Sequence, residues 1–354
     1  MTGKEYSLIR DVLDNNYINE GDITTLFEQN IATLVGAKHA IAVTSGTIAI
    51  FLSLAALAVG PGDEVIVPDV TFIATANAVR LAGANPVLVD IDPSTLNIDP
   101  EKITKALSPR TRAIIPVHVS GRAADMAAIL DIAGSHDLFV IEDAAEAFMS
   151  SLNGKYLGTF GRLGCLSFSP NKSITTGQGG MILTDDDVLH ARLRELKDQG
   201  RPVRGTGGDD IHFSVGYNFK LTNLQAAVGI GQLSALHERI QRQRRIYEIY
   251  SENLNGLDGV RLPGFRLDAG EVPLWTDALI DRRNELDNYL MERDILCRRF
   301  WLPIHTQKPY LSSGDRFPVS SALMPKALWL PSAFSLSDRD VYTVCSKIRE
   351  FFRA

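Results

Sequence analysis

Short apolar runs alternate with helical patterns along the N-terminal part of the chain. The runs lie at 40–44, 64–68, 86–91, 112–117 and 138–142, and the helical patterns between them lie at 48–59, 74–81, 100–107 and 123–135. Strands that are buried on both faces are nearly all apolar, as these runs are. Such alternation predicts an α/β fold with a mostly parallel sheet and helices on both of its faces.

Two further apolar runs, at 165–169 and 181–184, break this rhythm. The segment between them contains Pro170 and three glycines and is too short for a crossover helix. We therefore expect this segment to be a loop at the edge of a site. A long helical pattern then runs from 222 to about 254 and predicts one helix that links two domains. The predicted boundaries are 1–240 for a large domain and 241–354 for a smaller C-terminal α+β domain.

Composition narrows the class of protein. The chain has 354 residues, 45% of them hydrophobic, and a net charge of −6, which argues against binding to nucleic acid or to an anionic membrane. The three cysteines are too scattered for a disulfide framework or a zinc site, so no metal is expected. Residues 40–60 carry no charge, but Thr44-Ser45-Gly46-Thr47 interrupts them, which favours a strand, a turn and a buried helix over a membrane span. The N-terminus lacks the features of a signal peptide, and we expect a cytoplasmic protein.

Polar residues collect where the predicted strands end, which is where open α/β sheets bind ligands. Gly46 and Thr47 open a helix and offer N–H groups to an anion, although the same residues also suit an ordinary helix cap. Asp143 ends an apolar strand, where it either caps the next helix or holds a cationic ring nitrogen. Lys172 lies among hydroxyl-bearing residues and glycines on the loop that breaks the rhythm.

Together with Phe72, these residues suit pyridoxal 5'-phosphate. This coenzyme needs a phosphate cup, a face for its ring, a carboxylate for its pyridinium nitrogen and a lysine for a Schiff base. The same lysine can later act as the acid/base that moves a proton between the substrate carbon and the coenzyme.

Several motifs resemble the DegT/StrS-type sugar aminotransferases over nearly the whole chain. They are Ser45-Gly46-Thr47, Thr71-Phe72-Ile73-Ala74-Thr75-Ala76-Asn77, Glu142-Asp143-Ala144-Ala145, Lys172 with Thr175-Thr176-Gly177-Gln178-Gly179-Gly180, and Gly216-Tyr217-Asn218-Phe219-Lys220-Leu221-Thr222-Asn223. The resemblance implies the pyridoxal-phosphate-dependent transferase fold type I, similar to aspartate aminotransferase. It also implies a homodimer whose active sites are shared between subunits.

The family pattern implies a role for each matching residue. Lys172 would form the Schiff base, Asp143 would pair with the pyridinium nitrogen, and Phe72 would stack on the ring. The phosphate would be held by Gly46, Thr47, the backbone of Ile48, and Ser167, while Glu146 would contact the ring hydroxyl. Asn218 or Lys220 would reach the phosphate of the neighbouring subunit. The chain departs from the pattern at Gln178, where Glu is common. The given sequence also starts at Met1-Thr2-Gly3-Lys4-Glu5, without the Ile-Pro strand that relatives have ahead of the first helix, so either that strand is absent or the natural start lies upstream.

Within the family, Glu146, the run at 171–175 and Trp301-Leu302-Pro303-Ile304-His305 look most like the perosamine synthases. Those enzymes move an amino group from L-glutamate to C4 of GDP-4-keto-6-deoxymannose, with pyridoxamine phosphate as the intermediate cofactor form. Candidates for lining the sugar-nucleotide site are Tyr17, Arg298, Arg299, Trp301 and His305. Two alternatives stay open at this point. One is a 3-aminotransferase for a TDP- or UDP-keto sugar, and the other is a non-catalytic regulator that binds the cofactor or a sugar nucleotide.

Overall fold

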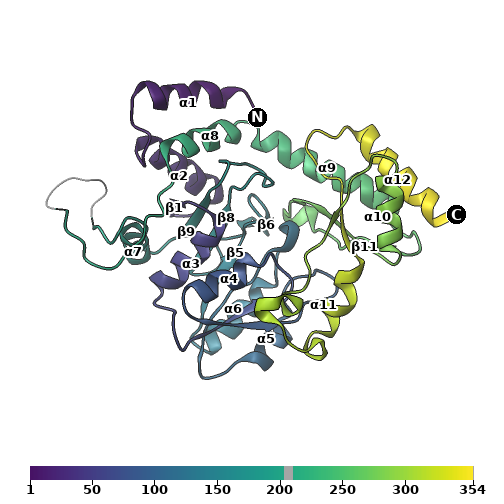
Figure 1. The fold of residues 1–354 in the computed structure, drawn as a ribbon, viewed down its shortest axis with the longest axis horizontal. Helices are drawn as coiled ribbons and strands as arrows, with labels where there is room; N and C mark the ends of the chain where they lie inside the picture. The colour runs from purple at the N-terminus through teal and green to yellow at the C-terminus, as the bar shows by residue number, and fades with distance from the viewer. Residues whose placement is uncertain (203–209, 354) are drawn as a thin grey trace.

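A seven-stranded sheet forms the centre of the molecule in the computed structural model, which describes residues 1–202 and 210–353 (Figure 1). Its order is β1-β9-β8-β5-β4-β2-β3. The strands are β1 (His39–Val43), β2 (Glu64–Pro68), β3 (Asn85–Val89), β4 (Thr111–Ile114), β5 (Phe139–Asp143), β8 (Leu163–Ser167) and β9 (Gly180–Thr184). β9 pairs antiparallel with both of its neighbours, β1 and β8, and the other pairings in this sheet are parallel. The predicted mostly parallel sheet is confirmed, with a short antiparallel connection at the point where the rhythm breaks.

Helices cover both faces of this sheet because its strands are apolar on both sides. In β1, Ile41 and Val43 face a core formed with α3 (Gly46–Ala56), α4 (Ala74–Leu81) and α7 (Asp187–Lys197). Ala40 and Ala42, one residue out of phase, face α2 (Asp22–Val35) and α8 (Asn223–Leu233). Further along that second face, α5 (Pro100–Ala106) and α6 (Met126–Ser135) cover β2, β3, β4 and β5, and α1 (Lys4–Asp14) packs on α8.

A second, four-stranded sheet lies in the C-terminal part, in the order β10-β11-β13-β12. Its strands are β10 (Val260–Arg261), β11 (Thr276–Ile280), β12 (Arg298–Arg299) and β13 (Ala327–Leu330). Its core is shared with α9 (Leu236–Leu254), α10 (Arg283–Met291) and α12 (Asp338–Arg353), while α11 (Pro318–Leu323) precedes β13. A hairpin of β6 (Ser151–Leu152) and β7 (Lys155–Tyr156) lies apart from both sheets. The boundary at residue 240 stays a prediction, and α9 runs across it.

The prediction of a single long helix over 222–254 is wrong. The structure has two helices there, α8 and α9, with a break at Ser234 and Ala235. The Ser234 hydroxyl donates to the carbonyl of Gly231 at 2.8 Å, which takes up an acceptor at the end of α8. The break lets α8 pack against α1 and α2 while α9 continues to the small sheet (Figure 1).

The uncharged segment 40–60 forms β1, a turn and α3, as predicted. Within the described ranges, we find no helix with the length and apolar character needed to cross a bilayer.

Candidate active site

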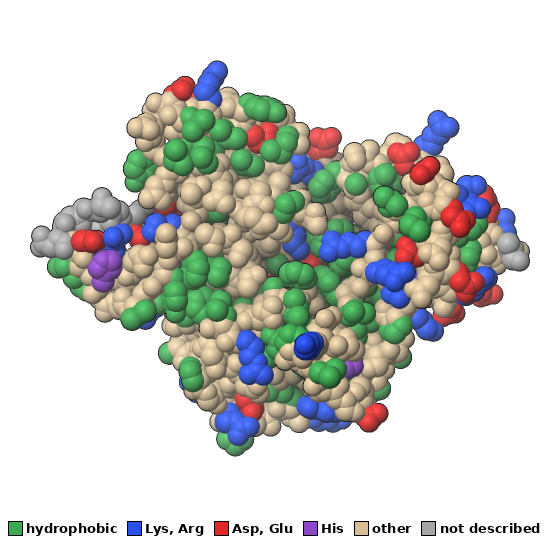
Figure 2. Space-filling view, in the orientation of Figure 1, with side chains coloured by type: hydrophobic (Ala, Val, Ile, Leu, Met, Phe, Trp, Pro, Cys, Tyr) green, Lys and Arg blue, Asp and Glu red, His purple; other side chains and the backbone are tan. Residues whose placement is uncertain are grey.

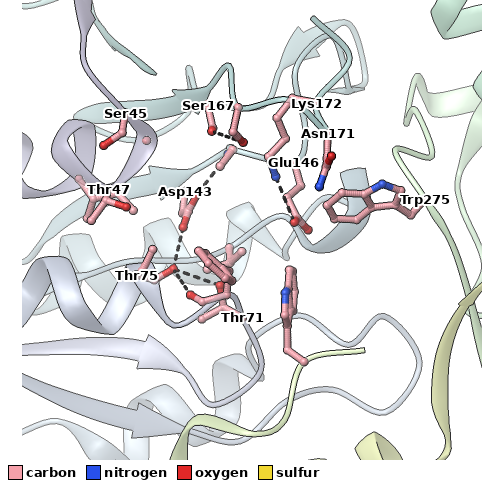
Figure 3. Close-up of a pocket in the computed structure, with 18 of the residues that line it drawn as sticks. Ser45, Thr47, Thr71, Thr75, Asp143, Glu146, Ser167, Asn171, Lys172 and Trp275 are labelled. Atoms are coloured by element: carbon pink, nitrogen blue, oxygen red, sulfur yellow. Dashed lines mark hydrogen bonds and ion pairs between the residues drawn. The ribbon is translucent and has the colours of Figure 1, made fainter. Parts of the chain in front are cut away.

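A cavity of about 210 Å³ opens at the carboxyl ends of β1, β2, β4, β5 and β8 (Figure 3). This edge of the sheet is where α/β folds bind ligands. The cavity brings together many of the residues singled out from the sequence, namely Gly46, Thr47, Phe72, Asp143, Glu146, Ser167, Lys172, Arg298 and Trp301.

One side of the cavity is built to receive an anion. Ser45 caps α3 by accepting a hydrogen bond from the N–H of Ile48 at 3.2 Å. The N–H groups of Gly46 and Thr47 donate to no other atom of the described chain, so they are available at the positive end of the helix. The Ser167 hydroxyl, 3.3 Å from that of Ser169, lies beside them. The Ile48 N–H, predicted to contact the phosphate, already donates to the Ser45 hydroxyl that caps α3. A phosphate would have to compete with that hydroxyl for this donor.

This anion site, formed by Gly46, Thr47 and Ser167 and called the anion cup below, is compact because two glycines allow close packing. A Cβ on Gly46 would lie 3.0 Å from the Cβ of Ser167. A Cβ on Gly180, the first residue of β9, would lie 2.4 Å from the carbonyl carbon of Ser45. The loop after Lys172 and the first turn of α3 therefore meet backbone to backbone.

Asp143 ends β5 and points into the cavity (Figure 3). The Thr75 hydroxyl donates to its Oδ2 at 2.8 Å, and the N–H of Ala145 donates to its Oδ1 at 3.1 Å. Burial raises the pKa of Asp143, and these hydrogen bonds and the charges of Lys172 and His118 offset only part of that effect. A buried carboxylate with a raised pKa gains most from a cationic group bound against it.

Lys172 lies between a carboxylate and an aromatic ring (Figure 3). Its Nζ donates to Oε1 of Glu146 at 3.3 Å and lies 4.9 Å from the centre of the Trp275 ring. Burial raises the pKa of Glu146, and the charge of Lys172 opposes this rise. The lysine is thus held inside the cavity rather than extended into solvent.

Glu146 is itself fixed by a strained residue. The N–H of Ser120 donates to its Oε2 at 2.9 Å, and Ser120 adopts a left-handed conformation with φ 54°. The Ser120 hydroxyl donates to Oδ1 of Asp277 at 2.8 Å, and Arg122 forms an ion pair with Oδ2 of Asp277. Asp277 lies on β11, so this buried network ties the wall of the cavity to the C-terminal sheet.

Glu142, next to Asp143, has a structural role. It is fully buried and accepts from the N–H groups of Gly158, Phe160 and Gly161, and it contacts Nε2 of His118 at 2.9 Å. Adjacent acids at one strand end therefore serve different purposes, because successive side chains point to opposite faces.

The wall opposite the anion cup comes from the C-terminal sheet. All three tryptophans of the chain, Trp275, Trp301 and Trp329, line the cavity together with Arg298. Sequence reasoning identified Trp301 and Arg298 but missed Trp275 and Trp329. The one available signal was that every tryptophan lies in the C-terminal part of the chain.

Several predicted residues lie elsewhere. His305 is buried against Asp69, with 2.6 Å between its Nδ1 and Oδ2, and is not among the residues that line the cavity. Tyr17 is exposed and its carbonyl accepts from the side chain of Asn223. Arg299 pairs with Asp287. The structure does not bring these three residues to the cavity, so their sugar-nucleotide roles stay predictions.

Asn218 and Lys220 lie in the segment that precedes α8. Asn218 and Lys220 form isolated backbone β-bridges with Asp198 and Val43, respectively. The Lys220 amine also forms an ion pair with Asp198. Neither residue lines the cavity of its own chain.

The comparisons with known proteins agree with this geometry. The sequence pattern of the DegT/DnrJ/EryC1/StrS aminotransferase family matches residues 1–349. The chain belongs to this family. GDP-perosamine synthase of Escherichia coli O157:H7 is 38% identical over 357 residues, which cover 99% of this chain and 96% of that protein. GDP-perosamine synthase of Caulobacter vibrioides is also 38% identical over 357 residues, covering 98% of this chain and 95% of that protein. The crystal structure of DesV from S. venezuelae superposes with a TM-score of 0.95 at 33% identity, covering 99% of this chain and 95% of that one.

This DegT/DnrJ/EryC1/StrS family member is a sugar-nucleotide aminotransferase that depends on pyridoxal 5'-phosphate. The cavity fits that cofactor on its own evidence. It offers free N–H groups at the start of α3 for a phosphate and a buried acid, Asp143, that forms no ion pair within the described residues. It also holds an amine, Lys172, and the ring of Phe72, which is 55% exposed in the cavity.

Proposed function

We propose that this aminotransferase moves an amino group from L-glutamate to C4 of GDP-4-keto-6-deoxymannose. The observation that carries this proposal is the similarity to GDP-perosamine synthases along nearly the whole chain. The intact pair of Asp143 and Lys172 in one cavity supports catalysis over a purely regulatory role.

The residues of this chain would divide the work as follows. Gly46, Thr47 and Ser167 would bind the phosphate, and Phe72 would cover one face of the ring. Asp143 would keep the ring nitrogen protonated, because burial disfavours its carboxylate charge and a cation bound beside it would offset that cost. When bound, pyridoxal phosphate supplies an aldehyde for imine exchange and a ring that withdraws electrons from the substrate carbon.

Lys172 would hold the cofactor at rest and, once displaced by the donor amine, carry a proton to or from the substrate carbon. Glu146 would keep the freed amine in the cavity through the hydrogen bond seen at 3.3 Å. Trp275 would exclude water from the other side of this amine.

The proposal includes a homodimer in the cytoplasm. Asn218 and Lys220 lie outside the cavity of their own chain, which suits a contribution to the partner's phosphate cup. The three cysteines are free, as a reducing compartment would keep them.

The test follows the two half-reactions separately. Purified enzyme that contains pyridoxal phosphate is mixed with L-glutamate alone, and we expect its yellow absorbance to bleach. A panel of keto-sugar nucleotides is then added, and we expect the colour to return with GDP-4-keto-6-deoxymannose and 4-amino product to form. Transfer only to a TDP-linked 3-keto sugar would reject the proposed acceptor. A protein that cannot be reconstituted with pyridoxal phosphate would reject catalysis.

A further inference from the structure

A second cavity of about 730 Å³ adjoins the first, and Lys172 and Trp275 line both of them. Arg239, near the start of α9, lines the second cavity but not the first. The same arginine also borders a cavity beside Met1, where the N-terminus lies next to the break between α8 and α9 (Figure 1). Arg239 therefore stands between the loop that carries Lys172 and the N-terminal part of the chain.

The guanidinium of Arg239 makes two hydrogen bonds through one nitrogen. Its Nη1 donates to the carbonyl oxygen of Ser173 at 2.9 Å and to the side-chain oxygen of Gln232 at 2.5 Å. Ser173 directly follows Lys172 in the chain. Hydrogen bonds from a charged donor are stronger than those between neutral groups, so this contact holds the main chain beside the lysine firmly.

The main chain of the Lys172 loop, residues 169–175, has little other support from outside. The N–H of Lys172 donates to the carbonyl of Ser169 at 3.1 Å, a turn of the loop on itself. In the part of the chain that the structure describes, Arg239 is the one group of another element that bonds to the main chain of this loop. The position of the loop relative to α9 thus depends on this arginine.

Gln232 fixes Arg239 from the other side. The Gln232 side chain is buried, and its NH₂ group donates to Oε1 of Glu5 in α1. One amide therefore accepts from a cation and donates to an acid, which suits both of its ends. Gln232 lies before the break between α8 and α9, and Arg239 lies after it. A chain of hydrogen bonds consequently runs from α1 to the residue after Lys172.

We propose that Arg239 is a positioning residue for Lys172, which fixes the main chain of the lysine while Glu146 holds its amine. The inference rests on the proposed role of Lys172 in binding the cofactor and moving the proton. A lysine with both duties must return its amine to the same place in every cycle, and a misplacement of about 1 Å can cost on the order of 100-fold in rate. Arg239 limits such movement from outside the first cavity.

The competing role for Arg239 is direct contact with an anionic substrate. Figure 2 shows Lys and Arg side chains at the hollow near the centre of this face, and Arg239 borders the second cavity. Positioning is favoured because the nitrogen of Arg239 that faces the loop is already shared between two acceptors. The experiment separates the two roles.

The experiment compares three variants. Arg239→Met keeps an unbranched side chain but removes the donors, and Arg239→Lys keeps the charge and one donor group. Arg245→Met is the control, because Arg245 lies on the same helix, is more exposed and pairs with Asp338. Amide hydrogen exchange of residues 169–176 is measured in each apoprotein. Bleaching of the holoenzyme by L-glutamate then gives a limiting rate and a half-saturating concentration, and tryptophan fluorescence follows the binding of GDP-mannose.

We expect Arg239→Met to speed amide exchange in residues 169–176 by about tenfold. Its limiting rate should fall by about tenfold, while half-saturation by glutamate and affinity for GDP-mannose stay within about twofold. Arg239→Lys should recover part of both losses, and Arg245→Met should match the wild type. If Arg239→Met does not fold, Arg239→Gln takes its place, because glutamine is too short to reach both acceptors.

Two results would overturn the inference. If only the resistance to urea falls in the Met or Gln variant, with exchange and limiting rate unchanged, Arg239 serves packing alone. If half-saturation by glutamate or affinity for GDP-mannose weakens while the limiting rate is unchanged, Arg239 contacts substrate instead.

Borohydride reduction of the wild-type holoenzyme, followed by peptide mass analysis, distinguishes this inference from the proposed roles. We expect the cofactor to be found on Lys172. If it is found on another residue, the proposed role of Lys172 fails and the inference fails with it. If it is found on Lys172 but the Arg239 variants behave as the wild type, only the inference fails. A wild-type enzyme that ignores L-glutamate would reject the proposed donor, and the exchange measurement on the apoprotein would still test Arg239.

Discussion

The amine of Lys172 lies 3.3 Å from Oε1 of Glu146, and both side chains are largely buried. The other carboxylate oxygen of Glu146 accepts from the backbone of Ser120, which is linked through Asp277 to the C-terminal sheet. The position of the lysine is therefore set by both parts of the chain. A change in the packing of the small sheet can reach the reacting amine through three hydrogen bonds, from Asp277 to Ser120, from Ser120 to Glu146 and from Glu146 to Lys172.

Replacement of Glu146 by Gln tests this link. The amide keeps the size of the side chain and an acceptor for Ser120, but its NH₂ group cannot accept from Lys172. We expect Glu146→Gln to bind pyridoxal phosphate normally and to slow the half-reaction with L-glutamate by about tenfold.

The pH profile gives the decisive comparison for this variant. Burial raises the pKa of Glu146, so the wild-type carboxylate takes up a proton at a higher pH than an ordinary Glu and then releases Lys172. The wild-type rate should fall as pH decreases through this range, and Glu146→Gln should lack that acidic limb. An identical acidic limb in both enzymes would show that another group titrates.

The buried carboxylate of Asp143 suits the cofactor but lowers the free energy of unfolding of the apoprotein. Its folded-state pKa is raised above the ordinary value of 3.8 by burial, so the folded apoprotein binds this proton more tightly than the unfolded chain does. The free energy of unfolding of the apoprotein must then fall as pH rises through the window above 3.8. We expect Asp143→Asn to stabilise the apoprotein at pH 7 by on the order of 1–2 kcal/mol and to abolish the half-reaction.

Thermal unfolding of the two apoproteins across pH 4 to 8 (roughly the span over which a raised carboxyl titrates) measures the effect. The stability difference should shrink toward acidic pH, where wild-type Asp143 is protonated. Asp131→Asn, on the exposed face of α6, is the control and should show no such trend. A constant difference at every pH would contradict the prediction.

Much of the fold and the cofactor side of the cavity could be predicted from local patterns. The apolar runs became the strands of the large sheet because burial on both faces requires that pattern, and Asp143 and Lys172 met because both follow strand ends. The opposite wall could not be predicted this way. Trp275 and Trp329 reach the cavity only through pairing of β11 with β13, a tertiary contact with no local signature.

His305 illustrates a different limit. Its place in the run 301–305 suggested a substrate contact, yet Asp69 at the end of β2 satisfies it inside the protein, with Phe317 stacked on its ring. A buried acid that pairs with a histidine far along the chain is invisible to a reading of either segment alone.

Gly180 tests the close packing behind the anion cup. A methyl group there would lie 2.4 Å from the carbonyl carbon and oxygen of Ser45, so β9 or the first turn of α3 must move. We expect Gly180→Ala to weaken pyridoxal phosphate binding by about tenfold or more, measured by equilibrium dialysis of the apoprotein. Gly134→Ala, in α6 with open space around the added carbon, should bind normally and gain up to about 1 kcal/mol of stability. Equal cofactor affinity in both variants would show that the cup tolerates the shift.

Glu5 lies in α1, remote from the cavity, and we predict that its hydrogen bonds hold α1 on α8 in a way that weakens at acidic pH. Burial alone would raise the pKa of Glu5, but hydrogen bonds from the backbone of Thr2 and the side chain of Gln232 lower it to about 2. This contribution to stability is fully present above the ordinary value of 4.5 and is lost as pH falls toward 2. Glu5→Gln should therefore lower the free energy of unfolding by about 1–3 kcal/mol at pH 7 and by less at acidic pH, as measured by urea denaturation. Glu238→Gln, an exposed change on α9, is the control. If Glu5→Gln matches that control at pH 7, the hydrogen bonds of Glu5 do not hold α1 on α8.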